Sequence, residues 1–262
     1  MKKILMLLMM AGFLAAWPIH TVLAQETGQK GASATDEYSD EFLDDDMDFL
    51  EEEEEGNIQV VQIADPIEPF NRAMFVVNDK LYFYCLKPLG QGYKAITPSF
   101  FRTGVKNFFQ NVETPIRLVN CLLQGKPKKA GTEILRFMVN TTVGIGGLGD
   151  PARKYHDLEV ADEDFGQTLA VWGVGQGAYV VLPFLGPMSV RHGAGKVPDY
   201  FLKPQTYVFD QWETSAMVWG GEQLNAVAMR IGDYEAMKAA AIDPYDAMKN
   251  GYAQLRDKKI AE

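Results

Sequence analysis

A run of 22 residues without a charged side chain, Leu169 to Val190, constrains the fold more than any other part of the sequence. It is long enough for a membrane-spanning helix, which needs about 20 apolar residues. Six glycines and prolines interrupt it, however, and both residue types disfavour one straight helix. The run therefore predicts either a bent hairpin, packed inside protein or lining a cavity at membrane depth, or an ordinary buried loop and strand.

Most of the chain after residue 64 has helical periodicity. Start signals at Asp65-Pro66, Thr97-Pro98 and Asp243-Pro244 precede apolar residues at helical spacing. The first helix is expected to end at Lys87–Gly90, and one helix is expected to cover Glu222–Ala241. Further segments are predicted as helical at 97–111, 116–123 and 207–219, and as helical or extended at 130–143. The predicted class is mostly α, without internal repeats.

The net charge of −10 does not describe this helical part. Residues 36–55 hold 13 acidic residues and no basic one, whereas residues 56–262 hold 21 acidic and 22 basic residues. A nearly neutral body lacks the positive charge with which nucleic-acid binders meet phosphates, so no nucleic-acid partner is predicted. The acidic segment itself predicts a solvated linker, or else an arm that docks on a basic partner.

The N-terminus predicts export. Lys2 and Lys3 precede an apolar stretch at 4–17, and a small-residue cleavage pattern ends at Ala24. The stretch is shorter than the about 20 residues of a spanning helix. We therefore expect a signal peptide at 1–24, a disordered acidic linker at 25–64 and a helical, membrane-associated domain at 65–262.

The sequence GIGGLG places Gly144, Gly146 and Gly149 at the spacing of a dinucleotide-binding loop. Such a loop requires a preceding strand, and helices are predicted there instead. The better interpretation is a bend in which two backbones approach closely. No cofactor is predicted.

Cysteine, histidine and serine give weak chemical signals. An exported chain could join Cys85 and Cys121 in a disulfide, while free cysteines are at least as common. His156 and His192 have no zinc-ligand spacing, so no metal site is predicted. Ser189 lies near His192 without a suggested third partner, and no catalytic residue is predicted. The acids before Phe165 are expected to begin a helix.

Several motifs in register resemble the MlaA (VacJ) family of outer-membrane phospholipid transport proteins. They cover most of residues 65–257 and follow the family's order. They read DPIEPFNRAMFVVND from Asp65, RTGVKNFFQNVETP from Arg102, VNCLLQGKP from Val119, RFMVNTTVGIGGLGDPA from Arg136, EDFGQTLAVWGVGQGAYVVLPFLGP from Glu163 and DPYDAMKNGYAQLRD from Asp243.

The resemblance implies a ring-like bundle of amphipathic helices, with a bent glycine- and proline-rich apolar hairpin and a central channel, on the periplasmic side of the outer membrane. It implies removal of mislocalised phospholipid from the outer leaflet and transfer to a periplasmic lipid-carrier protein, which maintains lipid asymmetry without enzymatic chemistry. A trimeric porin is a further implied partner.

The resemblance also assigns residues. Two segments are expected to form a lipid channel or ridge, namely Gly144, Ile145, Gly146, Gly147 and Leu148, and Trp172, Gly173, Gly175, Gly177 and Tyr179. The opening motif is expected to be structural, with Arg72 in a hydrogen-bond network; its residues are Asp65, Pro66, Glu68, Pro69, Asn71 and Arg72.

One departure concerns attachment. Many family members carry a lipidated cysteine directly after the signal peptide, where this chain has Gln25. Attachment is then expected to rest on the helices, or the protein is periplasmic. Two alternative functions remain open, a soluble periplasmic scaffold that uses the acidic arm and a lipid-modifying hydrolase.

Overall fold

The computed structural model describes residues 63–209 and 211–262. They belong to the second of two compact units into which the chain divides, Ile58–Glu262. The expected signal peptide and nearly all of the expected linker lie outside the described residues. Of that linker only Ile63 and Ala64 are described: Ile63 is buried, and the Ala64 carbonyl accepts a hydrogen bond from the Tyr179 amide.

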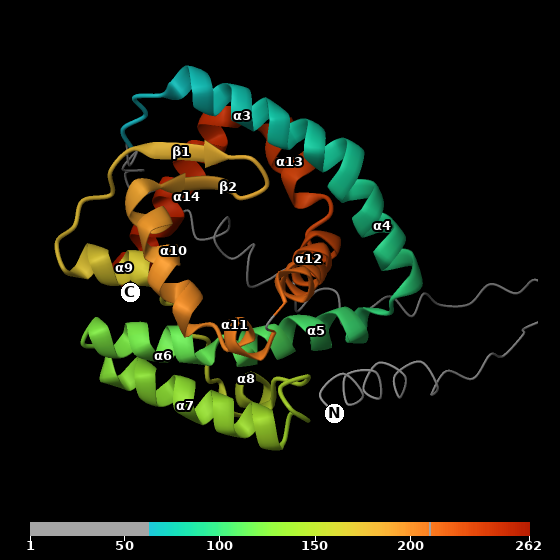
Figure 1. The fold of residues 1–262 in the computed structure, drawn as a ribbon, viewed down its shortest axis with the longest axis vertical. Helices are drawn as coiled ribbons and strands as arrows, with labels where there is room; N and C mark the ends of the chain where they lie inside the picture. Colours follow the sequence, from blue (N-terminus) through green and yellow to red (C-terminus); the bar gives the residue numbers. More distant parts are fainter. Residues whose placement is uncertain (1–62, 210) are drawn as a thin grey trace, which may run out of the picture. The chain divides into compact units, whose positions relative to one another are not determined.

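The described residues are mostly helical, which confirms the predicted class (Figure 1). The helices are α3 (Glu68–Leu81), η1 (Tyr82–Leu86, a π-helix), α4 (Lys87–Ile96), α5 (Ser99–Val112), α6 (Thr114–Leu123), α7 (Pro127–Thr142), α8 (Pro151–His156), α9 (Phe165–Val171), α10 (Val190–Leu202), α11 (Gln205–Val208), α12 (Trp212–Met229), α13 (Asp233–Ala240) and α14 (Pro244–Ala261). The strands are β1 (Tyr179–Leu182) and β2 (Gly186–Ser189).

The predicted helix end at Lys87–Gly90 is wrong. Helix α3 continues through the π-helix η1 directly into α4. Pro88 lies in the first turn of α4, where a missing N–H costs little. Gly90 serves packing, since a Cβ there would lie 3.1 Å from the Ile231 side chain, which follows α12. Gly90, which the sequence indicates as a helix end, therefore lies where α4 packs closely against the end of α12.

The predicted helix over Glu222–Ala241 is also wrong in its bounds. Helix α12 runs through Gly220 and Gly221, and the chain turns at Gly232 with a φ of +115°. Glycine adopts this conformation without the strain that a Cβ would cause. Helix α14 begins where predicted, with the Asp243 side chain accepting from the first backbone amides.

The long uncharged run forms the end of α9, a loop at 172–178 and an antiparallel hairpin of β1 and β2. Tyr179 pairs with Ser189 and Leu182 with Gly186. The segment is thus bent into a hairpin, as predicted from the glycines and prolines, and it is built from a loop and strands, as in the alternative interpretation. A single spanning helix is excluded for this segment.

Two asparagines of α3 hold the backbone of β1. The Asn71 amide donates to Tyr179 O at 2.9 Å and accepts from Val181 N at 2.9 Å. The Asn78 amide donates to Leu182 O at 3.0 Å and accepts from a backbone amide in the following turn at 3.0 Å. Seven helical residues span about 10.5 Å, and three strand residues span about 10 Å. The spacing of the two asparagines therefore matches the strand that they bind.

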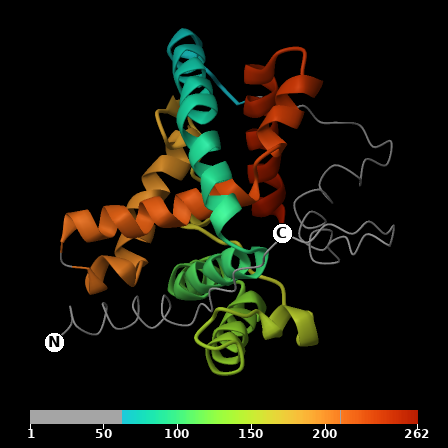
Figure 2. The same ribbon diagram turned by 90° about the vertical axis from the view of Figure 1, so that its right-hand side faces the viewer.

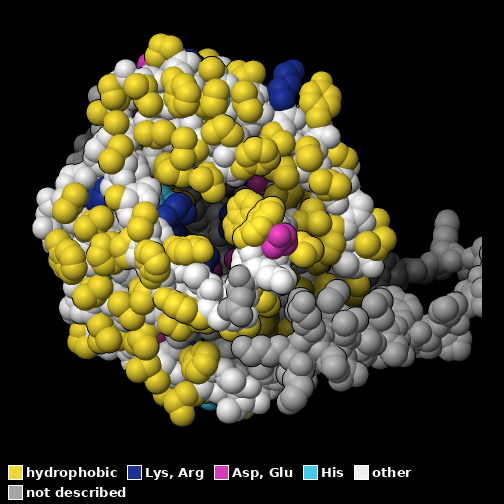
Figure 3. Space-filling model, viewed as in Figure 1, with side chains coloured by type: hydrophobic (Ala, Val, Ile, Leu, Met, Phe, Trp, Pro, Cys, Tyr) yellow, Lys and Arg dark blue, Asp and Glu magenta, His cyan; other side chains and the backbone are white. Residues whose placement is uncertain are grey.

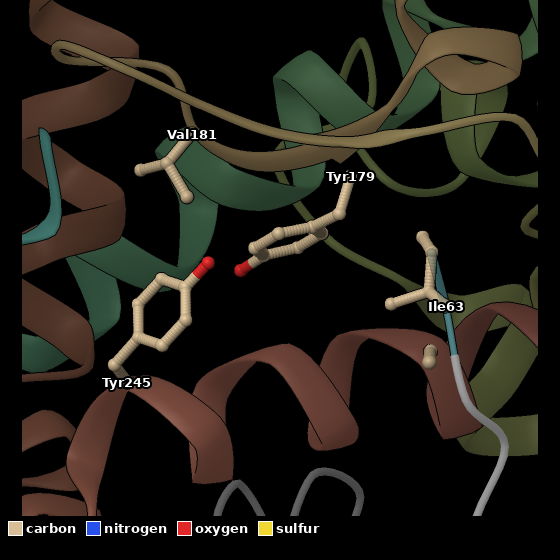
Figure 4. Packing of buried hydrophobic residues seen from close by; sticks show 5 residues of the cluster. Ile63, Tyr179, Val181 and Tyr245 are labelled. Carbon is tan, nitrogen blue, oxygen red and sulfur yellow. The ribbon is translucent and has the colours of Figure 1, made fainter. Parts of the chain in front are cut away.

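A small core lies between β1, α14 and the segment before α3. It contains Ile63, Tyr179, Val181, Tyr245 and Ala253 (Figure 4). The rings of Tyr179 and Tyr245 meet edge to face at 6.2 Å, with their hydroxyl ends turned toward each other. This packing fixes the hairpin against the last helix.

Figures 1 and 2 show how the remaining helices are arranged within this unit. Helix α12 is seen nearly end-on in Figure 1 and lengthwise in Figure 2, where it crosses α4. Helices α6 and α7 pack side by side. The face shown in Figure 3 is largely covered by hydrophobic side chains and is hollowed near its centre, where Lys, Arg, Asp and Glu side chains are visible.

Candidate functional site

The opening motif and the final motif form one polar cluster. The Asp65 carboxylate accepts from the Asn71 amide at 2.7 Å and from the Tyr245 hydroxyl, with the Lys249 ammonium at 3.6 Å. Asn71 and Tyr245 are both buried. Segments about 180 positions apart in the sequence are therefore joined by hydrogen bonds that also hold β1.

Arg72 lies at the edge of this cluster. Its guanidinium lies 4.4 Å above the Tyr245 ring and donates to three carboxylates, those of Glu68, Asp243 and Asp246. The motif's two prolines are Pro66, which precedes α3, and Pro69, which lies in its first turn. These contacts link α3 to α14 and its cap, in agreement with the structural role expected for the motif.

The first expected channel segment, Gly144–Leu148, is a tight turn after α7. A Cβ at Gly144 would lie 2.4 Å from Asn140 O, and one at Gly147 would lie 2.7 Å from the Asn111 side chain. Close backbone approach thus explains Gly144, as predicted, whereas Gly146 and Gly147 have positive φ. A helix precedes this turn rather than a strand. Ile145 in this turn has a φ of +55° and is 78% exposed.

The second expected segment, Trp172–Tyr179, leads from α9 into β1. The Trp172 ring N–H donates to Leu123 O at 3.2 Å. Gly173 and Gly177 have positive φ, and a Cβ at Gly177 would lie 3.1 Å from Val190. Around Gly175 there is open space. Residues 172–178 therefore form a surface loop held at both ends, whereas Tyr179 is buried in the core as the first residue of β1.

The structure does not bring these two segments into contact with the same elements. The turn at 144–148 lies on α5, where Asn107 donates to Leu148 O. The loop at 172–178 lies on the end of α6 and the start of α10. Their shared assignment to a channel or ridge stays a prediction.

A buried hydrogen-bond network between α6, α9 and α10 was not predicted. Gln124 donates to the Thr168 hydroxyl, which donates to Asn120, and the Asn120 amide donates to Asp199. All but Asp199 are at most 9% exposed. The four-residue spacing of Asn120 and Gln124 on one helix face was the available signal.

Two buried ion pairs fix the loop after α7. Arg117 pairs with Glu133 at 2.8 Å, and Arg136 pairs with Asp150 at 2.6 Å. The second Glu133 oxygen accepts from the Ala161 amide at 2.8 Å. Both arginines also line a small pocket with polar walls. Buried charges of this kind persist because each has its partner and further hydrogen bonds.

Helices α5, α10 and α12 bring three more ionisable groups together. Lys203 donates to Glu113 at 2.6 Å. Burial, and then the nearby Glu113, raise the pKa of Glu222. Burial and the neighbouring carboxylate therefore favour the protonated form of Glu222, whereas Lys203 favours its ionised form.

Ser189 and His192 come close but do not form a nucleophile and base. The Tyr252 hydroxyl lies between them, 3.4 Å from Ser189 Oγ and 3.2 Å from His192 Nδ1. Ser189 is 2% exposed and its Oγ accepts from the His192 backbone amide, which caps α10. His192 lies in the first turn of α10. Burial and the neighbouring Arg256 lower the pKa of His192 to about 4, so the ring is neutral at pH 7.

The acids before α9 include a helix cap, as predicted. Asp164 Oδ1 accepts from the Gln167 amide at 2.8 Å, and Arg256 binds both Asp164 oxygens at 2.6 and 3.0 Å. Burial opposes ionisation of Asp164, but Arg256 outweighs it and lowers the pKa to about 2.

Cys85 and Cys121 are both free. Cys85 is exposed on the π-helix η1, whereas Cys121 is fully buried in α6, where burial raises its pKa to about 11. The disulfide considered from the sequence is therefore not formed in this structure, and the alternative of free cysteines holds.

The distribution of polarity in the described residues is unusual for a water-soluble domain. Buried polar and charged residues outnumber buried hydrophobic ones, and many large hydrophobic side chains are exposed. Leu135 and Met138 on α7 are 53% and 58% exposed, and Phe201 and Trp212 are 60% and 76% exposed. Extensive exposed apolar surface marks a membrane or protein contact. Within 63–209 and 211–262, no helix is both long and apolar enough to cross a bilayer, and no cluster of metal-ligating residues is found.

Comparison with known proteins gives a consistent result. The model of the MlaA lipoprotein family matches residues 63–259. The intermembrane phospholipid transport system lipoprotein MlaA of Escherichia coli (strain K12) is 33% identical over 197 residues, covering 74% of this chain and 77% of that protein. The protein of the same name from Haemophilus influenzae is 30% identical over 216 residues, covering 78% and 84%.

A solved structure from work on the structural basis for maintenance of bacterial outer membrane lipid asymmetry has a similar fold. It aligns with a TM-score of 0.68 at 32% identity and covers 75% of this chain and 99% of that chain. An uncharacterized protein of Rickettsia conorii is 36% identical over 202 residues, covering 76% of this chain and 79% of that protein.

Proposed function

Because this chain belongs to the MlaA lipoprotein family, we propose that it is the outer-membrane component of an intermembrane phospholipid transport system. In this role it removes mislocalised phospholipid from the outer leaflet and passes it to a periplasmic carrier, which maintains outer-membrane lipid asymmetry. The proposed location is the periplasmic side of the outer membrane, with a trimeric porin as a further partner.

The distribution of hydrophobic and charged side chains over the described residues supports this proposal most strongly. Hydrophobic side chains cover its outer face, while charged side chains gather in the hollow of that face (Figure 3). Moving a charged headgroup through hydrocarbon is costly, whereas a polar passage beside an apolar surface lets headgroup and acyl chains each keep favourable surroundings. This arrangement serves transfer without any covalent step.

We propose that this chain acts in transport and has no enzymatic activity. The positions of Ser189, His192 and Tyr252 support this. In the hydrolase alternative, Ser189 would be activated by His192, but Tyr252 separates the two side chains and Ser189 is almost fully buried. The scaffold alternative depends on the acidic arm at 36–55, which lies outside the described residues.

Surface phospholipid in a gene-deletion strain tests the proposed function. A membrane-impermeant amine-reactive reagent labels phosphatidylethanolamine on intact cells. Labelling is expected to rise in the deletion strain, together with detergent sensitivity, and to return to normal on complementation. Unchanged labelling without detergent sensitivity would refute the transport role.

Cell fractionation separates the transport role from the scaffold. The double variant Leu135→Lys/Met138→Lys introduces two charges on the exposed apolar face of α7 and is expected to weaken membrane retention. Thr142→Lys adds a charge at an exposed polar position of the same helix and is the matched control. Wild-type protein found wholly in the soluble periplasm would favour the scaffold.

A further inference from the structure

Arg191 is a buried arginine that forms no ion pair with an acidic residue in the described ranges 63–209 and 211–262. It lies in the first turn of α10 and is 9% exposed. Its Nη1 donates to Val174 O at 2.9 Å, while its Nε has no hydrogen-bond partner among the described residues. The other buried arginines differ, because Arg117, Arg136 and Arg256 each bind a carboxylate.

An unpaired buried cation is unusual in a folded protein. Buried charges are normally paired, since the protein interior solvates them poorly. Burial, and then the nearby Arg256, lower the pKa of Arg191, and the more distant Asp257 and Asp164 offset this only in part. Within the part of the chain that the structure describes, no carboxylate forms an ion pair with this guanidinium.

Gln176 supplies a second unused donor beside Arg191. The Gln176 carbonyl accepts from the Arg191 backbone amide at 3.2 Å, so the backbones of the two residues are joined directly. The Gln176 side-chain Nε2 is buried and has no partner among the described residues. Both unused groups are donors, and an anion with several acceptor oxygens is their complement.

The helix N-terminus itself does not supply these donors. Val190 N donates to Ala178 O, Arg191 N to Gln176 O, and His192 N to the Ser189 hydroxyl. The donors without a described partner are therefore in the side chains of Arg191 and Gln176. Gln176 is part of the loop at 172–178, and Arg191 is joined to that loop through Val174 O. In this loop Val174 is 46% exposed, and Gly173 and Gly175 have open space around them.

We propose that Arg191 and Gln176 form a binding site for the phosphate group of a phospholipid headgroup. This inference rests on the proposed function and assigns the residues that recognise its substrate. The planar guanidinium fork matches phosphate oxygens, and the amide adds a neutral donor to the same group. The apolar loop at 172–178 lies beside the site and offers the acyl chains an apolar surface to contact.

Binding of soluble short-chain lipids to the full-length protein in detergent tests the site. The probes are dihexanoyl phosphatidylglycerol, dihexanoylglycerol, which lacks the phosphate, and inorganic phosphate, each measured by calorimetry. Arg191→Met is expected to weaken phosphatidylglycerol binding by about tenfold or more, because a charge-assisted hydrogen bond is lost. Gln176→Leu is expected to weaken it by about threefold.

Lys196→Met is the matched control, because it removes an equal charge from an exposed position of the same helix. It is expected to change the affinity less than about twofold, as surface charges act weakly. If Arg191→Met and Lys196→Met lose affinity for the phospholipid equally, the proposed site is refuted, and general electrostatic attraction explains the binding. Arg191→Lys keeps the charge without the fork and is expected to bind with intermediate affinity, which guards against misfolding of the Met variant.

The three probes distinguish the sources of the phosphate. Weak, Arg191-independent binding of dihexanoylglycerol supports phosphate recognition. Tight, Arg191-dependent binding of inorganic phosphate would overturn the lipid assignment in favour of free phosphate. Arg191-independent phospholipid binding overturns the site while the transport role stands, whereas an unchanged outer leaflet in the deletion strain overturns the transport role alone.

Discussion

The strand β1 and the loop that precedes it belong to one uncharged run, yet their polar surroundings differ. The backbone of β1 is paired on both sides, with β2 on one and the amides of Asn71 and Asn78 on the other. In the loop, Gln176 has a buried side-chain donor without a hydrogen-bond partner among the described residues, and so does Arg191, which donates to the loop carbonyl of Val174. Satisfied buried groups stabilise a fold, whereas unsatisfied ones cost stability unless a ligand completes them. The contrast separates a segment that holds the hairpin from one suited to recognition.

The largest effect is expected from Asn71→Leu. This change leaves Tyr179 O and Val181 N unpaired in the core and removes the amide from Asp65. Each buried group left unpaired costs about 1–3 kcal/mol, so the free energy of unfolding is expected to fall by about 5 kcal/mol. Denaturant unfolding monitored by circular dichroism measures this loss.

Asn78→Leu is the matched control for that change. It removes an equivalent amide from the same helix and the same hairpin, but at the partly exposed turn, where water can replace the lost bonds. A loss of about 1 kcal/mol is expected. If both variants lose the same free energy of unfolding, burial does not explain the difference expected between the two ends of β1.

Arg256→Met tests a paired arginine at the junction of α9, α10 and α14. It leaves the carboxylate of Asp164 without its bidentate partner. Breaking a buried pair costs about 3–5 kcal/mol, so a loss of about 4 kcal/mol is expected in thermal or denaturant unfolding. The double variant Arg256→Met/Asp164→Asn is expected to recover part of this loss, and no recovery would mean that packing of the arginine stem dominates.

His192 gives this junction a pH dependence. Its folded pKa of about 4 lies below the ordinary value of 6.5, so the unfolded chain binds a proton first as the pH falls. Stability from the neutral ring is present above pH 6.5 and is lost progressively toward pH 4, by about 3 kcal/mol. Asp164, with a pKa of about 2, loses its contribution only below about pH 4, in a separate window.

Unfolding measured from pH 7 to pH 4 checks this prediction. His192→Gln is expected to flatten the dependence between pH 6.5 and 4, while the decline below pH 4 remains. Arg256→Met is expected to move the histidine effect to higher pH, because Arg256 contributes to the lowered pKa. If the free energy of unfolding of His192→Gln depends on pH as it does in the wild type, other groups cause the pH dependence.

Local features of this fold were predictable from sequence, and long-range ones were not. The cap at Asp243 and the bent hairpin depend on neighbouring residues, so their patterns were sufficient. Gly90 was misread as a helix end because its packing partner is about 140 residues away. The seven-residue spacing of Asn71 and Asn78 likewise has meaning only once the bound strand is known.

The candidate site shows the same limit. The glycine loop at 172–178 was recognisable from composition and family resemblance, but the sequence does not show that Arg191 is buried under it. An arginine near a helix start is ordinarily solvent-exposed. Its significance comes from the absence of an ion-pair partner in the described residues, which depends on the positions of α9 and α14.

Arg191→Met is expected to have the smallest effect on stability and completes the comparison with Arg256. Because no described carboxylate pairs with its guanidinium, removing it releases the cost of burying a charge and loses one hydrogen bond to Val174 O. The free energy of unfolding without lipid is therefore expected to change by less than about 1 kcal/mol, or to rise. Denaturant unfolding of the two arginine variants in parallel measures the difference. A loss as large as that of Arg256→Met would mean that the fold itself compensates this charge, and the argument for a phosphate-binding site would then fail.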